Sequence, residues 1–339
     1  MAKARAIVKR RKAVKNTRKI TKTMQMIATA KFQKSLKRAV GTKPFTLHVR
    51  QAMVDLVAAV GEVKHPLVAS PDREKVGKIA VLVLSGNRGL AGAYNGNVAR
   101  AAERFLKTRQ AAGDEIELLT AGKKANSYFT FLKRKVTARF DQTMESASFE
   151  QVRELSDRLI KQYTDGGVDA IYVVYMNFVS TGVQKPEVVQ LLPLASAREA
   201  GDLLSRQASE HATAHEKASQ HGAAAADLAQ HEANLHARGQ SRGVEVDAGV
   251  ISNVVYEFSP SAKDLLDEVL PIAVRTMLFQ CFLDAITSEN VARMVSMKAA
   301  TDNADKMIKA LTMQYNRARQ SQITTELSEI MGGVEAMKK

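Results

Sequence analysis

The sequence predicts an α/β fold in which two long terminal helices flank a shorter domain of alternating strands and helices. Neither proline nor glycine occurs between Pro271 and Gly332, or from Met1 to Val40. Helices of this length, roughly 90 Å and 60 Å at about 1.5 Å per residue, are typical of coiled coils, membrane spans or helical repeats. Neither stretch contains the continuous apolar run of about 20 residues that a bilayer span requires. We therefore expect a rod built from the two ends of the chain.

The positive charge of the chain is concentrated at its N-terminus. The 339 residues carry a formal net charge of +15, and residues 1–54 hold 16 Lys and Arg with no acidic residue before Asp55, so the remainder sums to −1 (15 − 16). Such a helix attracts phosphate, anionic lipid or an acidic protein surface, whereas a charge run is usually only a solvated face. The segment also has the acid-free composition of a mitochondrial transit peptide, but its only serine is Ser35, and we interpret it as mature protein.

The N-terminal helix, assigned to residues 1–60, has few apolar residues. They are mostly 3, 4 or 7 positions apart, which predicts a narrow helical seam. The members of this seam are Ile7, Val14, Ile20, Met24, Ile27, Phe32 and Leu36. After a bend near Gly41 and Pro44, we expect the helix to continue over Phe45–Val60.

Residues 78–258 form the predicted α/β domain. The short apolar run Lys78–Leu84 is typical of a strand that is buried on both faces. Further strands are expected at 115–120, 136–140, 169–179, 183–194 and 254–258, and helices at 95–109, 123–132 and 149–163. This alternation predicts a mostly parallel, Rossmann-like sheet with covering helices.

Residues 205–243 differ in composition from the rest of this domain. They contain 11 Ala and five of the seven His of the chain, and Leu228 and Leu235 are their only large aliphatic residues. We expect a marginal helix or helical hairpin that is partly disordered, because so few apolar side chains cannot form a core.

The C-terminal helix, assigned to residues 259–339, begins with Ser259-Pro-Ser, which supplies N-cap chemistry and places Pro260 in the first turn. Its apolar residues keep a 3–4 spacing and then skip five positions, a stutter that changes local supercoiling. These residues are Leu278, Phe282, Ala285, Ile308, Leu311, Tyr315, Ala318, and then Ile323, Leu327, Ile330 and Val334. The single cysteine, Cys281, lies among apolar residues, which indicates a buried structural thiol in a reducing compartment.

Gly86, Gly89 and Gly92 follow the first strand and precede a helix, which is the position of a dinucleotide-binding loop. Their spacing is G-x-x-G-x-x-G instead of G-x-G-x-x-G, and the next strand lacks the acidic residue that holds a ribose, so a tight turn is favoured. His211 and His215 have a metal-ligand spacing, but their low-complexity surroundings favour solvated side chains. We expect no catalytic residue, no cofactor and no metal in this chain.

The two termini carry motifs that are more specific than a generic helix. NTRKITKTMQM at 16–26 and ATAK at 28–31 closely resemble the N-terminal helix of the gamma subunit of F-type ATP synthases. The C-terminal match consists of ENVARMVSMKAATDNA at 289–304, YNRARQ at 315–320 and ITTELSEIMGG at 323–333. GLAG at 89–92, with Asn95 and Asn97, resembles the Gly-Leu-Cys-Gly loop of the family, with Ala91 in place of cysteine. Val334 replaces the alanine that ends the family signature, and 205–243 resembles an insertion without the cysteines of the chloroplast branch.

The resemblance implies a non-catalytic subunit, the central rotary shaft that couples proton flow to ATP synthesis. Its terminal helices would form an antiparallel coiled coil inside a ring of three alpha and three beta subunits, and its α/β domain would sit on the epsilon subunit and the membrane c-ring. The complex would lie at the cytoplasmic face of a bacterial inner membrane, with a mitochondrial or chloroplast membrane as the alternative. The matching positions imply that the shaft contacts the ring through Lys22, Met24, Arg319, Gln320, Thr324 and Glu326.

Two other classes of function are weighed against this one. A basic coiled-coil nucleic-acid-binding protein would explain the N-terminal charge, but only Phe32 and Phe45 supply aromatic rings in residues 1–54. A Rossmann-type oxidoreductase would explain the glycine loop but neither of the long helices. Tight binding of NAD or ATP to the isolated chain would separate these classes, because a shaft is expected to bind neither tightly.

Overall fold

The computed structural model describes residues 2–42, 44–46, 48–49, 52, 56, 65–68, 77–194 and 262–337. The expected segment 205–243 and the expected strand 254–258 lie outside the described residues. Within them, the chain divides into two compact units. The first consists of Met1–Lys31, Leu90–Gly92 and Asn290–Lys339, and the second consists of Phe32–Gly89 and Ala93–Glu289.

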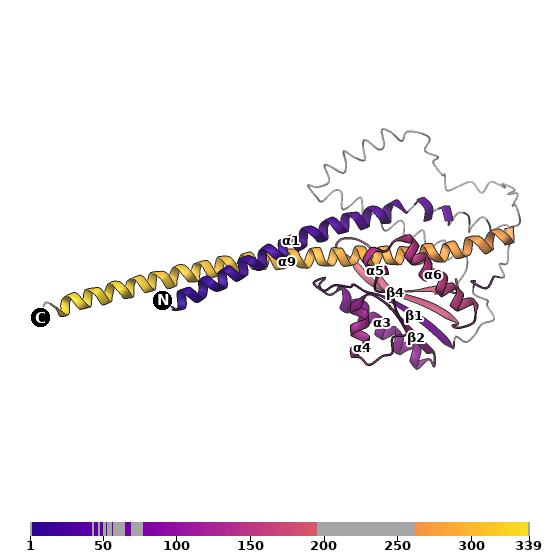
Figure 1. Ribbon diagram of the computed structural model, residues 1–339, viewed down its shortest axis with the longest axis horizontal. Helices are drawn as coiled ribbons and strands as arrows, with labels where there is room; N and C mark the ends of the chain where they lie inside the picture. Colours follow the sequence, from indigo (N-terminus) through magenta and orange to yellow (C-terminus); the bar gives the residue numbers. More distant parts are fainter. Residues whose placement is uncertain are drawn as a thin grey trace, which may run out of the picture. The chain divides into compact units, whose positions relative to one another are not determined.

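Both long terminal helices are present (Figure 1). Helix α1 spans Ala2–Gly41 and helix α9 spans Ala262–Ala336, with 40 and 75 residues respectively. Pro271 lies inside α9, and Gly332 and Gly333 do not end it. Helix α1 ends at Gly41, Thr42 is a turn residue and residues 44–46 are helical, so the predicted bend near Gly41 and Pro44 coincides with the end of α1.

The second unit contains a 5-stranded sheet with the order β3-β2-β1-β4-β5. The strands are β1 Lys78–Leu84, β2 Glu115–Ala121, β3 Ala138–Arg139, β4 Ala170–Phe178 and β5 Gln184–Leu192. All neighbours pair in parallel except β4 and β5, which are antiparallel. The prediction of a mostly parallel sheet is therefore confirmed. The edge strand β3 is shorter than the expected 136–140, and β1 is buried from Ile79 to Leu84, as its apolar run predicts.

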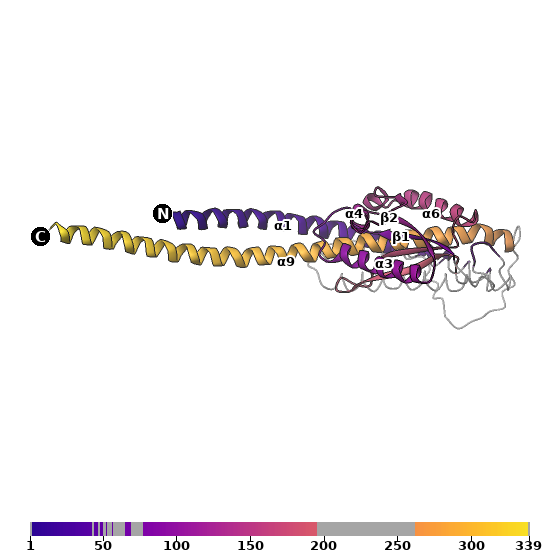
Figure 2. The same cartoon turned by 90° about the horizontal axis from the view of Figure 1, so that it is seen from below.

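Helices cover both faces of this sheet (Figures 1 and 2). They are α3 Tyr94–Ala111, α4 Lys123–Phe131, α5 Thr143–Ser146 and α6 Phe149–Thr164, of which only the short α5 is absent from the sequence prediction. Alternate residues of a strand point to opposite faces. Ala80 and Leu82 of β1 share one core with residues of α6 and α9. The buried residues of α3, such as Val98 and Leu106, lie outside that core while α3 contacts the strands, so α3 covers the opposite face.

The first part of α9 is a core helix of the second unit. Leu270, Leu278 and Phe282 are fully buried in the core that it shares with the sheet, and Cys281 is buried, which confirms its interpretation as a structural thiol. By length and composition alone, the stretch Asp264–Val334 is apolar enough to cross a membrane, with a window of mean hydropathy 1.6. This composition fits a packed core helix, because 72% of that window is buried inside the structure.

His65 ties the segment before β1 to the start of α9. Its Nε2 lies 3.3 Å from Oδ1 of Asp267, and its Nδ1 accepts a hydrogen bond of 3.0 Å from the backbone N–H of Leu67. Because Nδ1 accepts, the proton of the neutral ring is on Nε2 and faces the carboxylate. Burial lowers the pKa of His65, and the nearby charge of Asp267 opposes this shift without cancelling it.

Candidate functional site: the paired helices

In the first unit, α1 and α9 lie side by side and run in opposite directions (Figures 1 and 2). The guanidinium of Arg11 lies over the ring of Tyr315, 5.2 Å from its centroid. Nε of Arg18 is 2.5 Å from Oδ1 of Asp305. Residue numbers rise along α1 as their partners' numbers fall along α9. The expected antiparallel pairing of the terminal helices is therefore confirmed.

The face of α9 that packs on α1 has a heptad pattern. Its buried or half-buried residues alternate at intervals of 4 and 3 positions, which keeps one seam facing a partner helix in a left-handed coiled coil. They are Met297, Thr301, Ala304, Ile308, Leu311, Tyr315 and Ala318. The predicted seam members from Ile308 to Ala318 are confirmed.

The seam on α1 differs from the prediction by one position. Thr21 is 9% exposed and Ala28 is 1% exposed, whereas Ile20 and Ile27 are 56% and 52% exposed. Including Ile20 and Ile27 in the seam was therefore wrong. The burial of Ile7, Val14, Thr21 and Ala28, seven apart, follows a strict heptad that faces α9, and the two isoleucines lie one position outside it.

Two polar side chains, Thr21 and Thr301, occupy the seam because they are hydrogen-bonded to each other. Oγ1 of Thr301 lies 2.8 Å from Oγ1 of Thr21, and both groups are buried. Hydrogen-bonded hydroxyls can be buried without a large desolvation penalty. As a result, Ile20, Ile27 and Met26, which is 54% exposed, form an apolar stripe on an otherwise basic helix. Sequence periodicity did not reveal this stripe, because it favours the larger side chains as core.

Beyond Gln322, helix α9 is exposed on all sides in the described residues. Ile323, Leu327, Ile330 and Val334 are 51–65% exposed, so their assignment to a packed seam was wrong. The geometry explains this exposure. Arg11 is level with Tyr315, and α1 begins nine residues before Arg11 (11 − 2). The first residue of α1 is therefore level with about position 324 of α9 (315 + 9), and no part of α1 covers α9 beyond that point.

The residues predicted to contact a ring fall into two groups on these helices. Lys22 is exposed and Met24 is half-buried on α1. On α9, Arg319, Gln320, Thr324 and Glu326 are all exposed. Oγ1 of Thr324 donates to the backbone carbonyl of Gln320 at 3.0 Å, and Glu326 accepts a hydrogen bond of 2.8 Å from Nε2 of Gln322.

The glycine loop after β1 is filled by groups of the protein itself. A Cβ at Gly86 would lie 2.5 Å from Oε1 of Glu289. Gly122, between β2 and α4, also packs against this loop: its φ is +104°, and a Cβ there would lie 1.9 Å from the carbonyl oxygen of Ser85. The first backbone N–H groups of α4 donate to Oδ1 of Asn87 at 3.0 Å, to the carbonyl of Gly86 at 3.1 Å and to Oγ of Ser85 at 2.8 Å. Within the loop, the backbone N–H of Gly86 donates to Oδ1 of Asn95 on α3 at 2.9 Å, and Nδ2 of Asn95 donates to the carbonyl of Arg88 at 3.3 Å. These contacts favour the tight turn over a dinucleotide site.

Metal binding finds no support in the described residues, which contain no group of three His, Cys, Asp or Glu side chains that could hold an ion. The histidines at 211 and 215 lie outside that part of the chain.

Known proteins match this chain over nearly its whole length. A match to the family described as ATP synthase covers residues 3–337. The ATP synthase gamma chain of Rhodopirellula baltica is 37% identical over 338 residues, covering 100% of both chains. The chain belongs to the ATP synthase gamma chain family. The gamma chains of Kineococcus radiotolerans and Leptospira biflexa are 35% and 32% identical to it and cover 98% and 99% of it, or 96% and 100% of their own lengths.

Solved structures share the fold with this gamma-family chain. A chain of the Euglena gracilis mitochondrial ATP synthase rotor matches with a TM-score of 0.54 at 14% identity, covering 95% of this chain and 99% of that one. A chain from the OSCP/F1/c-ring structure of the same enzyme matches with a TM-score of 0.56 at 17% identity, covering 99% and 95%.

Proposed function

We propose that this chain is the central rotary shaft of an F-type ATP synthase, and that it couples proton flow through a membrane sector to ATP synthesis at the beta subunits. The antiparallel pair of terminal helices carries this proposal, since it joins the two ends of a chain whose relatives over their full lengths are gamma chains. The shaft itself is non-catalytic and holds no cofactor. Its role is mechanical.

The proposed partners are three alpha subunits, three beta subunits, the epsilon subunit and the c-ring. The structural relatives belong to a rotor and to an F1/c-ring assembly, which supports this set. The similarity to bacterial gamma chains supports a position at the cytoplasmic face of a bacterial inner membrane, where the chain is held peripherally through the complex.

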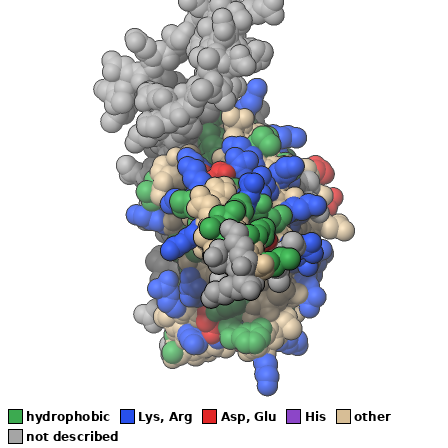
Figure 3. Space-filling view, turned by 90° about the vertical axis from the view of Figure 1, so that its left-hand side faces the viewer, with side chains coloured by type: hydrophobic (Ala, Val, Ile, Leu, Met, Phe, Trp, Pro, Cys, Tyr) green, Lys and Arg blue, Asp and Glu red, His purple; other side chains and the backbone are tan. Residues whose placement is uncertain are grey.

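A shaft drives a ring of identical subunits only if its sides differ. In the sequence of the paired helices, residues 1–31 carry 11 basic and no acidic residues, whereas residues 290–336 carry six basic and five acidic residues, giving +11 against +1 (6 − 5). Lys and Arg side chains are far more abundant than Asp and Glu on the face in Figure 3. A rotating shaft of this kind presents a different potential to each beta subunit. Each orientation therefore stabilises a different set of beta conformations.

The ring contacts are proposed at Lys22 and Met24 on α1 and at Arg319, Gln320, Thr324 and Glu326 on α9. Their exposure or partial exposure supports this assignment. On α1, the cations around Met24 would attract an acidic lever of the beta subunit. Coulomb attraction is long-ranged and tolerates sliding, which interlocked side chains would not.

A charge substitution tests this electrostatic contact. We expect Met24→Lys to reduce ATP-driven proton pumping, because it places another cation next to the acidic lever. The loss should depend on salt concentration, since exposed charges are screened within about 8–10 Å at physiological ionic strength. Met24→Leu is the matched control, since it keeps the size of the side chain without the charge. Identical pumping by the two variants at every salt concentration would refute the electrostatic contact.

The whole assignment is tested by purification. This chain should co-purify with alpha and beta subunits in roughly threefold excess over it, as the closed ring requires. Recovery without these subunits would contradict the proposal. The nucleic-acid alternative is weakened because Phe32 is 6% exposed and cannot stack on a base, which leaves Phe45, 50% exposed, as the one accessible ring of the two in residues 1–54. The oxidoreductase alternative is weakened by the filled glycine loop.

A further inference from the structure

Helix α4 ends in an aromatic side chain that the second unit does not cover. Phe131 is 83% exposed, which makes it the most exposed aromatic residue in the described part of the chain. Leu132 beside it is 39% exposed. The opposite side of the helix is fixed, because Ala125 and Phe129 are fully buried. Phe131 is therefore held outward on a rigid support.

The turn after α4 places a lysine where the backbone favours glycine. The backbone N–H of Lys133 donates to the carbonyl of Thr130 at 3.0 Å, and that of Arg134 donates to the carbonyl of Phe129 at 2.9 Å, which is the Schellman pattern. In this pattern the residue at the position of Lys133 is left-handed and usually glycine; here φ is +56°. A side chain in this conformation costs about 1–2 kcal/mol. Its presence at a strained position points to a function for the side chain.

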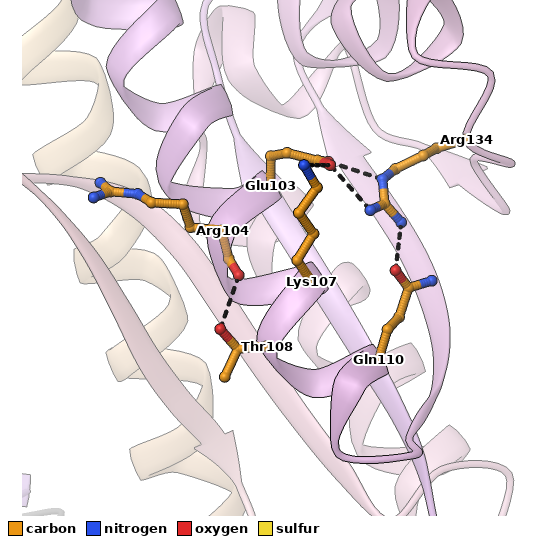
Figure 4. A network of polar contacts seen from close by, with 6 residues as sticks. All are labelled: Glu103, Arg104, Lys107, Thr108, Gln110 and Arg134. Atoms are coloured by element: carbon orange, nitrogen blue, oxygen red, sulfur yellow. Dashed lines mark hydrogen bonds and ion pairs between the residues drawn. The ribbon is translucent and has the colours of Figure 1, made fainter.

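Arg134 locks this turn onto the neighbouring helix (Figure 4). Its Nε and Nη2 donate to the two carboxylate oxygens of Glu103 on α3, at 2.8 and 3.0 Å, and its Nη1 donates to Gln110 at 3.1 Å. A bidentate pair of this kind fixes both partners in one geometry. Nζ of Lys107 is also 3.6 Å from Glu103, so the one acidic group here is already neutralised. The exposed residues that follow Phe131 are thus preorganised.

The stretch of chain that contains Phe131 is basic. No acidic residue occurs between Glu117 and Asp141. Six basic residues lie in the same stretch, namely Lys123, Lys124, Lys133, Arg134, Lys135 and Arg139. Apart from Arg134, they are exposed. An exposed apolar side chain on a basic stretch of chain complements a carboxylate-rich surface with an apolar centre.

We propose that Phe131, Leu132, Lys133 and Lys135 form a docking surface for an acidic surface of another protein subunit of the assembly. This inference rests on the proposed function only for the source of the partner. Exposed aromatic residues on rigid supports are the usual energetic centres of protein interfaces. Binding of single-stranded nucleic acid needs several stacking rings along a cationic groove, and α4 offers one exposed ring. The observations therefore favour a protein partner.

Photo-cross-linking in the purified complex tests the contact. Phe131 is replaced by p-benzoylphenylalanine, the complex is irradiated, and adducts are mapped by mass spectrometry. We expect an adduct to one other subunit, within a segment rich in Asp and Glu. Adducts to lipid or nucleic acid, or no adduct in a complex that has assembled, would overturn the inference. Absence of the complex itself would instead contradict the proposed function, so the two failures are distinguishable.

Two substitutions then separate binding from folding. Lys133→Gly relieves the left-handed strain, so it should raise the thermal midpoint of the chain. Because it also removes a cation of the docking surface, the cross-linked subunit should dissociate at a lower NaCl concentration in native mass spectrometry. Phe131→Ala should weaken retention of that subunit about tenfold or more, because it removes the central apolar contact. Lys185→Gln, at the opposite edge of the sheet on β5, is the matched charge control and should leave retention unchanged. Retention that is unchanged in Lys133→Gly and Phe131→Ala would overturn the docking surface.

Discussion

The buried threonine pair in the coiled coil gives a measurable prediction about what holds the two helices in register. Thr21 and Thr301 lie on opposite helices with their hydroxyl oxygens 2.8 Å apart. Each hydroxyl also has a backbone carbonyl of its own helix within reach, Arg18 at 3.1 Å and Met297 at 2.8 Å. The perturbation is replacement of one or both threonines by valine, which has nearly the same shape without the hydroxyl.

The expected magnitude follows from these contacts. Thr21→Val removes the interhelical hydrogen bond, but the hydroxyl of Thr301 can still donate to its own helix. The cost is therefore about 1 kcal/mol, the usual net value of one hydrogen bond, without the larger penalty of an orphaned donor. The same holds for Thr301→Val. The double variant pairs two apolar groups in a dry seam and should cost well under the sum of about 2 kcal/mol, because replacing both partners is often nearly neutral.

Hydrogen–deuterium exchange of the amides of residues 14–28 measures this directly, since it reports local opening of the helix pair. Each single variant should speed exchange about fivefold, which corresponds to 1 kcal/mol, and the double variant should speed it less than the product of the two. Thr312→Val is the control, because the hydroxyl of Thr312 donates to the carbonyl of Ile308 in its own helix, at 2.8 Å. A double variant as costly as the sum of the singles would refute the pairing.

Three further predictions concern the shaft tip and the α/β unit. Replacing Arg319 and Gln320 together by alanine should weaken ATP-driven proton pumping or assembly while the thermal unfolding of the α/β unit is unchanged, because both are exposed, and unchanged pumping would count against it. Gly122→Ala should lower the free energy of unfolding by about 3 kcal/mol or more, because its Cβ would lie 1.9 Å from a backbone oxygen. Gly113→Ala, at φ +92° with open space around it, should lower it only by the backbone strain, and equal thermal midpoints of the two variants would contradict this. Burial lowers the pKa of His65, so the folded state binds fewer protons than the unfolded chain. The stability of the chain should therefore fall as the pH drops through the region of the ordinary histidine pKa. A His65→Gln variant that loses as much stability over the same pH range would refute this assignment.

Strong local patterns made most of the fold predictable. The uninterrupted apolar run Lys78–Leu84 and the glycine-free ends of the chain each allow only one element type, and both occur as expected. The short helix α5 was missed because Thr143–Ser146 is too brief for any periodicity to show. Strand β3 was predicted too long because, at the sheet edge, it pairs with one neighbour over only Ala138 and Arg139.

The shaft surface was less predictable for a physical reason. Hydrophobicity favoured Ile20 over Thr21 as a seam residue, but a threonine that meets another threonine across the seam is buried at little cost. A partner on a distant segment leaves no trace in local spacing. In the same way, exposure of Leu327 near the end of α9 depends on where α1 begins, which is known only once Arg11 and Tyr315 are seen together.

Rotation of this chain within the assembled ring tests the central claim most directly. Because Cys281 is buried and is the only cysteine, a Lys185→Cys variant offers one accessible thiol to which a bead can be attached. With the alpha and beta subunits fixed to a surface and ATP supplied, the account predicts that the bead turns in one direction in three equal steps per turn. A complex that hydrolyses ATP while the bead stays fixed would contradict it.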